Sequence, residues 1–103
     1  MSAKEALRKA RNSVDGQYGV LLEHGSMELG YYAPDGVDNQ QPHEQDEIYI
    51  VQSGHGRFEC GDEVIEFEAG DALFVAAGVR HRFVDFSQDF ATWVVFYGPA
   101  GGE

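Results

Sequence analysis

His43, Glu47 and His81 are the residues whose types and spacing point most directly to chemistry. Two imidazoles and one carboxylate suit a divalent first-row metal and leave coordination positions open for water or substrate. In an extended strand, residues two and four positions apart point to the same side. Gln41, His43 and Glu47 are therefore expected to share one face, and His81 has to come from a second strand nearby. The amide oxygen of Gln41 is then a candidate fourth ligand.

The elements that must position these residues are expected to be short strands. From residue 18 onward, runs rich in Val, Ile, Phe and Tyr alternate with glycine-containing turns, a pattern typical of a sandwich or barrel. The predicted strands are 18–23, 27–33, 41–44, 46–52, 56–60, 63–67, 72–76, 81–86 and 90–97. No segment between them has the pattern of a crossover helix, so the sheets are expected to be antiparallel and the fold class all-β.

A short helix is expected over residues 3–12. Ser2 and Glu5 are spaced as a capping box, and small or apolar residues follow at helical intervals. This arm also carries four of the seven basic residues, namely Lys4, Arg8, Lys9 and Arg11. Because so short a helix is marginal alone, the arm is expected to dock on an acidic surface through these cations; a disordered tail is the alternative. The apolar part of the contact is expected from Ala6, Leu7 and Ala10.

The composition limits the compartment and the classes of partner. A formal net charge of −11 over 103 residues repels nucleic acid and anionic lipid, so neither is expected as a partner. No apolar run reaches the length of a membrane span, and no secretory signal is visible. The single cysteine, Cys60, cannot form an internal disulfide, which makes the cytoplasm the simplest compartment. The length is that of one domain.

Two segments of the chain resemble the paired motifs of the cupin superfamily. The first motif has a Gly, a His-x-His, a Glu and a second Gly, and it corresponds here to Gly36, Gln41-Pro42-His43, Glu47 and Gly54. The second has a Gly, a Pro-x-Gly, a His and an Asn, and it corresponds to Gly70, Ala76-Ala77-Gly78, His81 and Asp85. The spacing agrees throughout the second motif. In the first motif Gly36 lies one residue too close.

The resemblance implies a single-domain cupin with an antiparallel jelly-roll-like β-barrel and a short N-terminal helix. We accordingly expect a helical arm over 1–16, the barrel over 17–98 and a flexible tail over 99–103. The resemblance also implies one divalent transition metal (Fe, Mn, Ni or Zn) inside the barrel, held by Gln41, His43, Glu47 and His81. Gln41 departs from the motif, because His is usual there and imidazole is the better donor. A metal-free cluster, with Glu47 hydrogen-bonded between two His, is the alternative.

Three functions are compatible with this chain. The first is a metal-dependent enzyme acting on a small organic molecule by dioxygenase, isomerase or lyase chemistry. The second is a non-catalytic barrel that binds or senses a small ligand, and the third is a structural accessory domain. The candidate pocket residues, which are also suited to filling the core, are Tyr49, Phe83, Trp93 and Phe96.

A homodimer is expected from the outer surface of the predicted barrel. Ile48 and Ile50 point opposite to Glu47, hence away from the metal. An apolar stripe on the outer face of a sheet is commonly covered by a partner. The alternative is that the N-terminal segment of the same chain covers these two residues.

Overall fold

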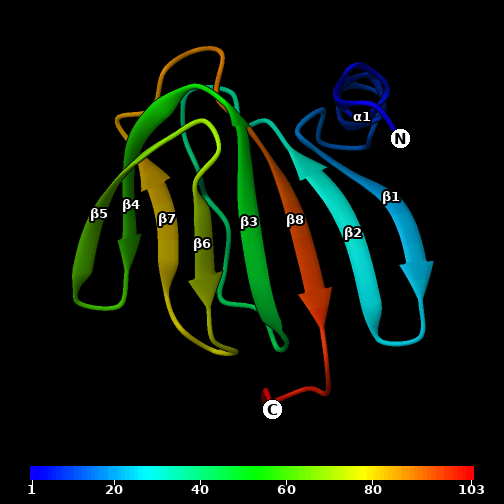
Figure 1. The fold of residues 1–103 in the computed structure, drawn as a ribbon, viewed down its shortest axis with the longest axis vertical. Helices are drawn as coiled ribbons and strands as arrows, with labels where there is room; N and C mark the ends of the chain where they lie inside the picture. Colours follow the sequence, from blue (N-terminus) through cyan, green and yellow to red (C-terminus); the bar gives the residue numbers. More distant parts are fainter.

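Two antiparallel sheets, of five and three strands, form the protein (Figure 1). The computed structural model describes all 103 residues. The elements are α1 (Ala3–Arg11), β1 (Tyr18–His24), β2 (Met27–Tyr32), β3 (Asp46–Ser53), β4 (His55–Cys60), β5 (Glu63–Glu68), β6 (Ala72–Val75), β7 (His81–Val84) and β8 (Ala91–Tyr97). The larger sheet has the order β1-β2-β8-β3-β6, and the smaller has the order β5-β4-β7.

The mostly-β fold with one short N-terminal helix, predicted from the sequence, is confirmed. All the strand pairs are antiparallel, as expected. The predicted closed barrel is not confirmed. Strands β5 and β1 are free edges, and strand pairing does not close the two sheets into one ring. The architecture is therefore two facing sheets that share one core.

One predicted strand, 41–44, is absent, and its residues lie in the loop between β2 and β3. The backbone groups here bond to other loops instead of to a neighbouring strand. The carbonyl of His43 accepts from the Gly78 amide at 2.8 Å, and the carbonyl of Glu44 accepts from the Gly101 amide at 2.7 Å. Period-two alternation therefore does not place His43 beside Glu47, and the loop has to do so.

The core lies between the sheets and follows the alternation of the strands. In β3, Glu47, Tyr49 and Val51 are buried, whereas Ile50 between them is exposed. The large sheet contributes aliphatic residues and tyrosines to this core, and the smaller sheet with its adjoining loop contributes the aromatic residues Phe58, Phe67, Phe83 and Phe90. A glutamate thus occupies a position in a row of core residues.

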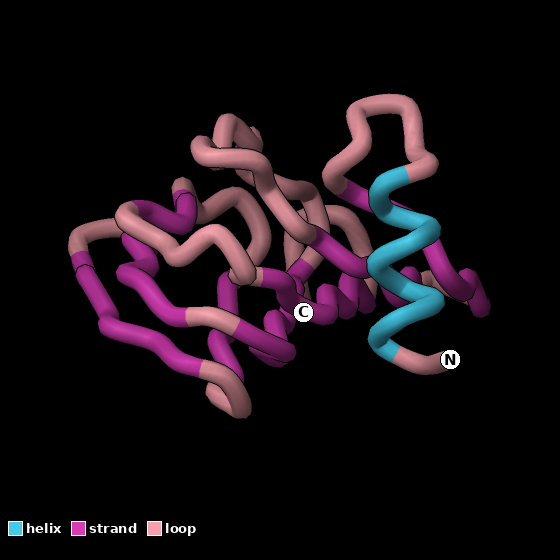
Figure 2. Tube along the Cα trace, turned by 90° about the horizontal axis from the view of Figure 1, so that it is seen from above, coloured by secondary structure: helices cyan, strands magenta, loops and turns pink.

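Helix α1 packs on the outer face of the large sheet, over β1 and β2 (Figure 2). The Ser2 side chain caps it by accepting from the Glu5 amide at 3.1 Å. Ala6 and Ala10 are fully buried against Tyr31. The close approach is possible because β1 carries Gly19 beneath the helix, where a Cβ would lie 2.8 Å from the Ala10 amide nitrogen.

The arm does not dock through ion pairs with an acidic surface, contrary to the sequence-based expectation. None of Lys4, Arg8, Lys9 and Arg11 forms an ion pair. Arg11 instead donates to the backbone carbonyls of Gly16 and Ala33, at 3.1 and 2.8 Å. Leu7, expected in the contact, is 38% exposed. Small side chains give the helix its close fit, because they let two backbones approach, and Arg11 adds hydrogen bonds to backbone carbonyls.

Residues 99–103, predicted to be a flexible tail, fold back toward the start of β3. The Glu103 amide donates to the Asp46 carboxylate at 3.2 Å, and the Ala77 amide donates to the same carboxylate at 2.8 Å. Asp46 thereby links the C-terminal residues to the loop that precedes β7. The single helix, α1, has neither the length nor the apolar character needed to cross a membrane.

Replacing Gly19 with Ala should lower the free energy of unfolding by about 1–3 kcal/mol, because the new methyl group meets helix backbone that has to move. Urea denaturation of the full chain measures this. The neighbouring Val20→Ala, at a side chain that is 46% exposed, is the control and should stay within about 0.5 kcal/mol of the parent. Equal effects of the two changes would show that α1 does not rest on Gly19.

Candidate metal centre

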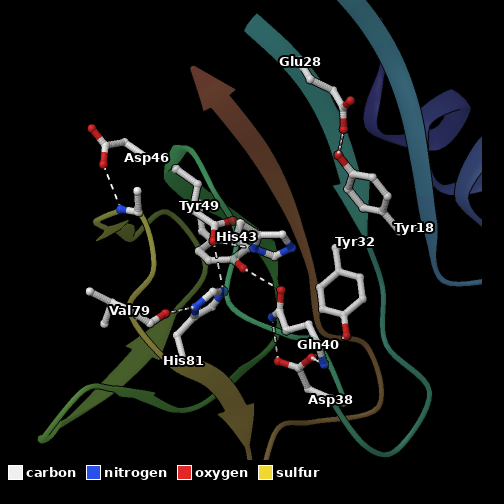
Figure 3. A network of polar contacts seen from close by, with 12 residues as sticks. Tyr18, Glu28, Tyr32, Asp38, Gln40, His43, Asp46, Tyr49, Val79 and His81 are labelled. Atoms are coloured by element: carbon white, nitrogen blue, oxygen red, sulfur yellow. Dashed lines mark hydrogen bonds and ion pairs between the residues drawn. The ribbon is translucent and has the colours of Figure 1, made fainter. Parts of the chain in front are cut away.

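The side chains of His43, Glu47 and His81 lie close together. Figure 3 shows His43 and His81 beside Tyr49. His43 Nδ1 lies 3.0 Å from Glu47 Oε1, and His81 Nε2 lies 2.9 Å from the same oxygen. One ligand atom from each residue falls within 4.8 Å of the other two. The structure thus brings together three of the four residues predicted to hold a metal.

Each of the three side chains is fixed by a different part of the fold. Glu47 lies on β3, which pairs with β8 on one side and β6 on the other, and is fully buried. His81 begins β7, and its Nδ1 donates to the Val79 carbonyl at 2.8 Å. Because that nitrogen carries the proton, the lone pair of neutral His81 is on Nε2, which faces Glu47. His43 lies on the loop, with its ring 4.8 Å from that of Phe96 in a T-shaped contact.

Two buried polar atoms in the cluster make no hydrogen bond: Glu47 Oε2, and His81 Nε2, which lies 2.9 Å from Glu47 Oε1 but in the neutral ring directs a lone pair, not a proton, toward it. An unsatisfied buried acceptor costs about 1–3 kcal/mol, and more when the group is charged. Both atoms are electron-pair donors, and a cation between them would satisfy both. The donor set of two imidazoles and one carboxylate also matches a divalent transition metal. The residues present therefore fit the predicted metal.

The surroundings of the cluster shift the pKa values of Glu47 and His81. Burial by itself raises the pKa of Glu47, but the two imidazoles beside it prevail and bring the pKa below its ordinary value. Burial by itself lowers the pKa of His81, but the Glu47 carboxylate and the Val79 carbonyl outweigh it and raise the pKa. Protons therefore compete with a metal for His81 at a higher pH than for an isolated imidazole.

A cavity of about 420 Å³ opens beside His43. Its lining consists of Asp15, Gln17, Tyr18, Glu28, Tyr32, Val37, Asn39, Gln40, His43, Tyr49, Val94 and Phe96. Phe96 connects its two ends, because its ring contacts both His43 and Tyr18. His43 therefore joins the cluster to the cavity, whereas Glu47 and His81 are not part of its lining.

A family model described as "Cupin domain" matches residues 29–97. The chain belongs to the cupin family. An uncharacterized protein of Streptomyces coelicolor is 38% identical over 97 residues, which cover 92% of each chain.

Solved structures of cupins have the same fold. The plu4264 protein of Photorhabdus luminescens superposes with a TM-score of 0.67 over 84% of this chain and 83% of its own, at 16% identity. A cupin 2 conserved barrel domain protein of Salinispora arenicola gives a TM-score of 0.65 over 79% and 74%, at 22% identity. At these identities the likeness shows the fold alone.

Gln41, the residue at which this cupin departs from the family motif, is exposed and makes no side-chain hydrogen bond with the cluster. Its neighbour Gln40 points inward instead. Gln40 accepts from the Tyr49 hydroxyl at 3.0 Å and donates to Asp38 at 2.8 Å. The structure therefore places Gln40, and not Gln41, among the interior groups, although Gln40 belongs to the cavity wall and not to the three-residue cluster.

The four predicted pocket residues divide between three places. Tyr49 and Phe96 line the cavity. Phe83 is buried in the core between the sheets and is not part of the lining. Trp93 lies on the outer face of β8, where its ring is 5.0 Å from that of Tyr31. Trp93 thus supports the sheet from outside and does not reach the cavity.

Asp38 is the residue of this site that sequence reasoning missed. It is only 4% exposed and accepts from the Tyr32 hydroxyl at 2.6 Å and from the Phe83 amide at 2.8 Å. It thereby ties the loop that carries His43 to both sheets. No local signal marks it, because its neighbours Asn39 and Gln40 are polar and resemble an ordinary surface loop.

The affinity of this cupin for Zn²⁺ should fall as the pH is lowered from about 8 to about 6. His81 must be neutral to bind, and its raised pKa makes proton competition begin above the ordinary imidazole value of about 6.5. Below that pKa, each pH unit should weaken binding about tenfold for each proton displaced. Calorimetric titration with Zn²⁺ at several pH values measures this.

The stability of the metal-free protein at the same pH values provides the control. The raised pKa of His81 weakens metal binding at low pH, but in the metal-free protein it stabilises the fold there. A raised folded-state pKa means that the His81 contribution to stability is complete below about 6.5 and is lost as the pH rises through the folded value. Glu47 contributes no change in this window, because its pKa is lowered from 4.5. A Zn²⁺ affinity that stays constant across the window would contradict the assignment of His81 as a ligand.

Proposed function

We propose that this cupin holds one divalent transition metal at His43, Glu47 and His81 and acts there on a small organic molecule. The observation that supports this most is the pair of buried, unpartnered donors, Glu47 Oε2 and His81 Nε2, beside a cavity of about 420 Å³. An apolar-walled cavity with a few convergent polar groups is the usual form of a small-molecule site. Membership of the cupin family agrees with a ligand of this size.

Three protein ligands leave coordination positions open toward the cavity. When bound, the metal would supply Lewis-acid polarisation or a site for dioxygen, which covers isomerase, lyase and dioxygenase chemistry. His43, with its side chain 34% exposed, is the ligand on the cavity side. Phe96 and Val94 supply apolar wall that limits water beside it. Burial raises the pKa of the Tyr49 phenol well above 10, so Tyr49 remains a hydrogen-bond donor at neutral pH.

A non-catalytic small-ligand or sensing cupin is the second candidate. The observation that favours it concerns the acids around the cavity. Glu28 and Asp38 each already accept a hydrogen bond from a tyrosine, at 2.7 and 2.6 Å, so neither is a free general base. Screening of small organic substrates with the metal-loaded protein, with and without oxygen, separates the candidates. Turnover identifies an enzyme, and saturable binding without turnover identifies a sensor.

Stoichiometric metal should be found in the protein after supplementation with Fe, Mn, Ni and Zn in turn, and the variant His43→Ala/His81→Ala should lose it. Elemental analysis measures the content. At a free metal concentration of 100 times the dissociation constant, the gain in stability should be about 2.7 kcal/mol in the parent and absent in the variant. His24→Ala, at an exposed histidine on β1, is the matched control and should keep the metal. A parent that binds none of the four metals would reject the proposal.

We also propose a homodimer formed through the outer face of the large sheet. Strand register aligns one row of apolar residues directly across all five strands, in the order Leu22, Leu29, Val95, Ile48 and Phe74. A second row contains Tyr31, Trp93, Ile50 and Ala72. Helix α1 covers only the β1 and β2 end, and Phe74 and Ile50 remain 56% and 40% exposed. A continuous apolar sheet face of this kind is characteristic of a protein–protein interface.

Phe74→Glu should convert the dimer to a monomer, because it places a charge at the most exposed apolar side chain of the proposed contact. Sedimentation velocity at micromolar concentration reports the mass. Val64→Glu is the control, since Val64 is 61% exposed on β5 of the other sheet. A parent protein that sediments as a monomer would remove the dimer from consideration.

We keep the cytoplasm as the proposed compartment. The thiol of Cys60 is free and half-buried, and the chain offers no second cysteine for a disulfide. Structural disulfides are rare in a reducing cytoplasm, so their absence agrees with that location.

A further inference from the structure

The end of the cavity farthest from the metal cluster carries negative charge without a protein cation to offset it. The lining includes Asp15 and Glu28 but no lysine or arginine. The arginine ion pairs lie on the smaller sheet, where Arg57 contacts Asp85 and Arg82 contacts Glu59. No ion pair reaches either of the lining carboxylates.

Glu28 is the main source of negative charge at this end of the cavity. It is half-buried on β2, and one of its oxygens accepts from the Tyr18 hydroxyl at 2.7 Å. Strand register places it directly opposite Glu23 of β1. Like charges directly opposite each other destabilise a sheet, and neither glutamate has an ion-pair partner in the protein. A bound cation would relieve this repulsion.

A third carboxylate, Asp38, lies behind the cavity wall formed by Tyr32 and Gln40. It is buried, and its hydrogen-bond donors are all uncharged: the Tyr32 hydroxyl, the Gln40 amides and the Phe83 backbone. Arg82 acts on this charge through space but is held in an ion pair with Glu59, so Asp38 keeps direct contacts with neutral donors only. In an environment of reduced dielectric constant, that charge still acts on a molecule in the cavity.

The walls between these acids are aromatic. Tyr18 makes T-shaped contacts with Tyr32 and Phe96, each at a centroid distance of 6.4 Å. The Tyr18 ring can fold over the inner face of the sheet because β2 carries Gly30 beneath it, where a Cβ would lie 2.1 Å from the Tyr18 hydroxyl oxygen. The faces of such rings attract cations, and groups of them recognise ammonium ligands.

We infer that this cavity selects an organic cation, a molecule that carries an ammonium group to the Glu28, Tyr18 and Phe96 end while its remainder faces His43. The inference rests on the proposed function in that it names the ligand class of the same cavity. The tyrosines of the cavity agree with it. The pKa of Tyr18 is raised mainly by burial and secondly by Glu28, and the pKa of Tyr32 is raised mainly by burial and secondly by Asp38. Burial disfavours a charge of either sign, but the parts of the two shifts that come from Glu28 and Asp38 report neighbouring negative charge, which favours a cation.

The test compares three probes of one shape and different charge. Choline is the cation, dimethylbutanol is its neutral isostere with carbon in place of nitrogen, and dimethylbutanoate is the corresponding anion. Each is titrated into the isotope-labelled full chain, first metal-free and then loaded with Zn²⁺, and amide chemical shifts are followed. Choline should bind about tenfold more tightly than dimethylbutanol, with shifts at Tyr18, Glu28 and Phe96. Dimethylbutanoate should not shift these signals in the metal-free protein.

Glu28→Gln isolates the charge, because the amide oxygen can still accept from Tyr18. The variant should lose most of the preference for choline and keep its affinity for dimethylbutanol. Glu66→Gln, which removes one charge from the exposed face of β5, should leave the preference intact. Equal binding of choline and dimethylbutanol, tighter binding of the anion in the metal-free protein, or no choline shifts at the cavity would overturn the inference.

The two proposals fail separately in this design. Metal content is measured by elemental analysis, and the charge preference is measured first without metal. A chain that binds no metal yet prefers choline loses the proposed function and keeps the inference. A chain that binds metal but shows no charge preference keeps the function and loses the inference.

Discussion

The constraint on which this structure depends is the burial of one carboxylate, Glu47, in the core between two sheets. A buried charge without compensation costs several kcal/mol, so the surrounding fold has to supply partners. It does so from both sides, with His81 from the smaller sheet and His43 from a loop. Neither imidazole satisfies the second carboxylate oxygen, Oε2. The unsatisfied atom is the acceptor that the proposed metal would complete.

A second buried carboxylate, Asp38, holds in place the loop that carries His43. The loop between β2 and β3 has no strand partner of its own, and Asp38 holds it through donors from Tyr32 and Phe83. The same residue orients Gln40, which in turn accepts from Tyr49 in the cavity wall. The position of His43 therefore depends on an acid that does not touch the metal cluster. Asp38 also contributes to the negative potential of the cavity.

The two faces of the large sheet carry different kinds of side chain. Its inner face carries Glu47, Tyr49 and the cavity wall, and its outer face carries aligned rows of apolar side chains. Helix α1 covers one end of the outer face and leaves the β3 and β6 end open (Figure 1). Because alternate residues of β3 serve opposite faces, Glu47 of the cluster and Ile48 and Ile50 of the proposed interface lie on the same strand but on opposite sides of the sheet.

The sequence by itself determined the mostly-β class, the capped helix, the strand rhythm and the three residues that form the cluster. These depend on local period and residue type. The tertiary structure decided the rest. Which glutamine points inward depends on Asp38, whose partner Phe83 is far along the chain. The sequence also does not show which face of the sheet Trp93 occupies, because β8 is apolar on both sides and its two faces look alike. The register of β8 with β2 and β3 places Trp93 on the outer face.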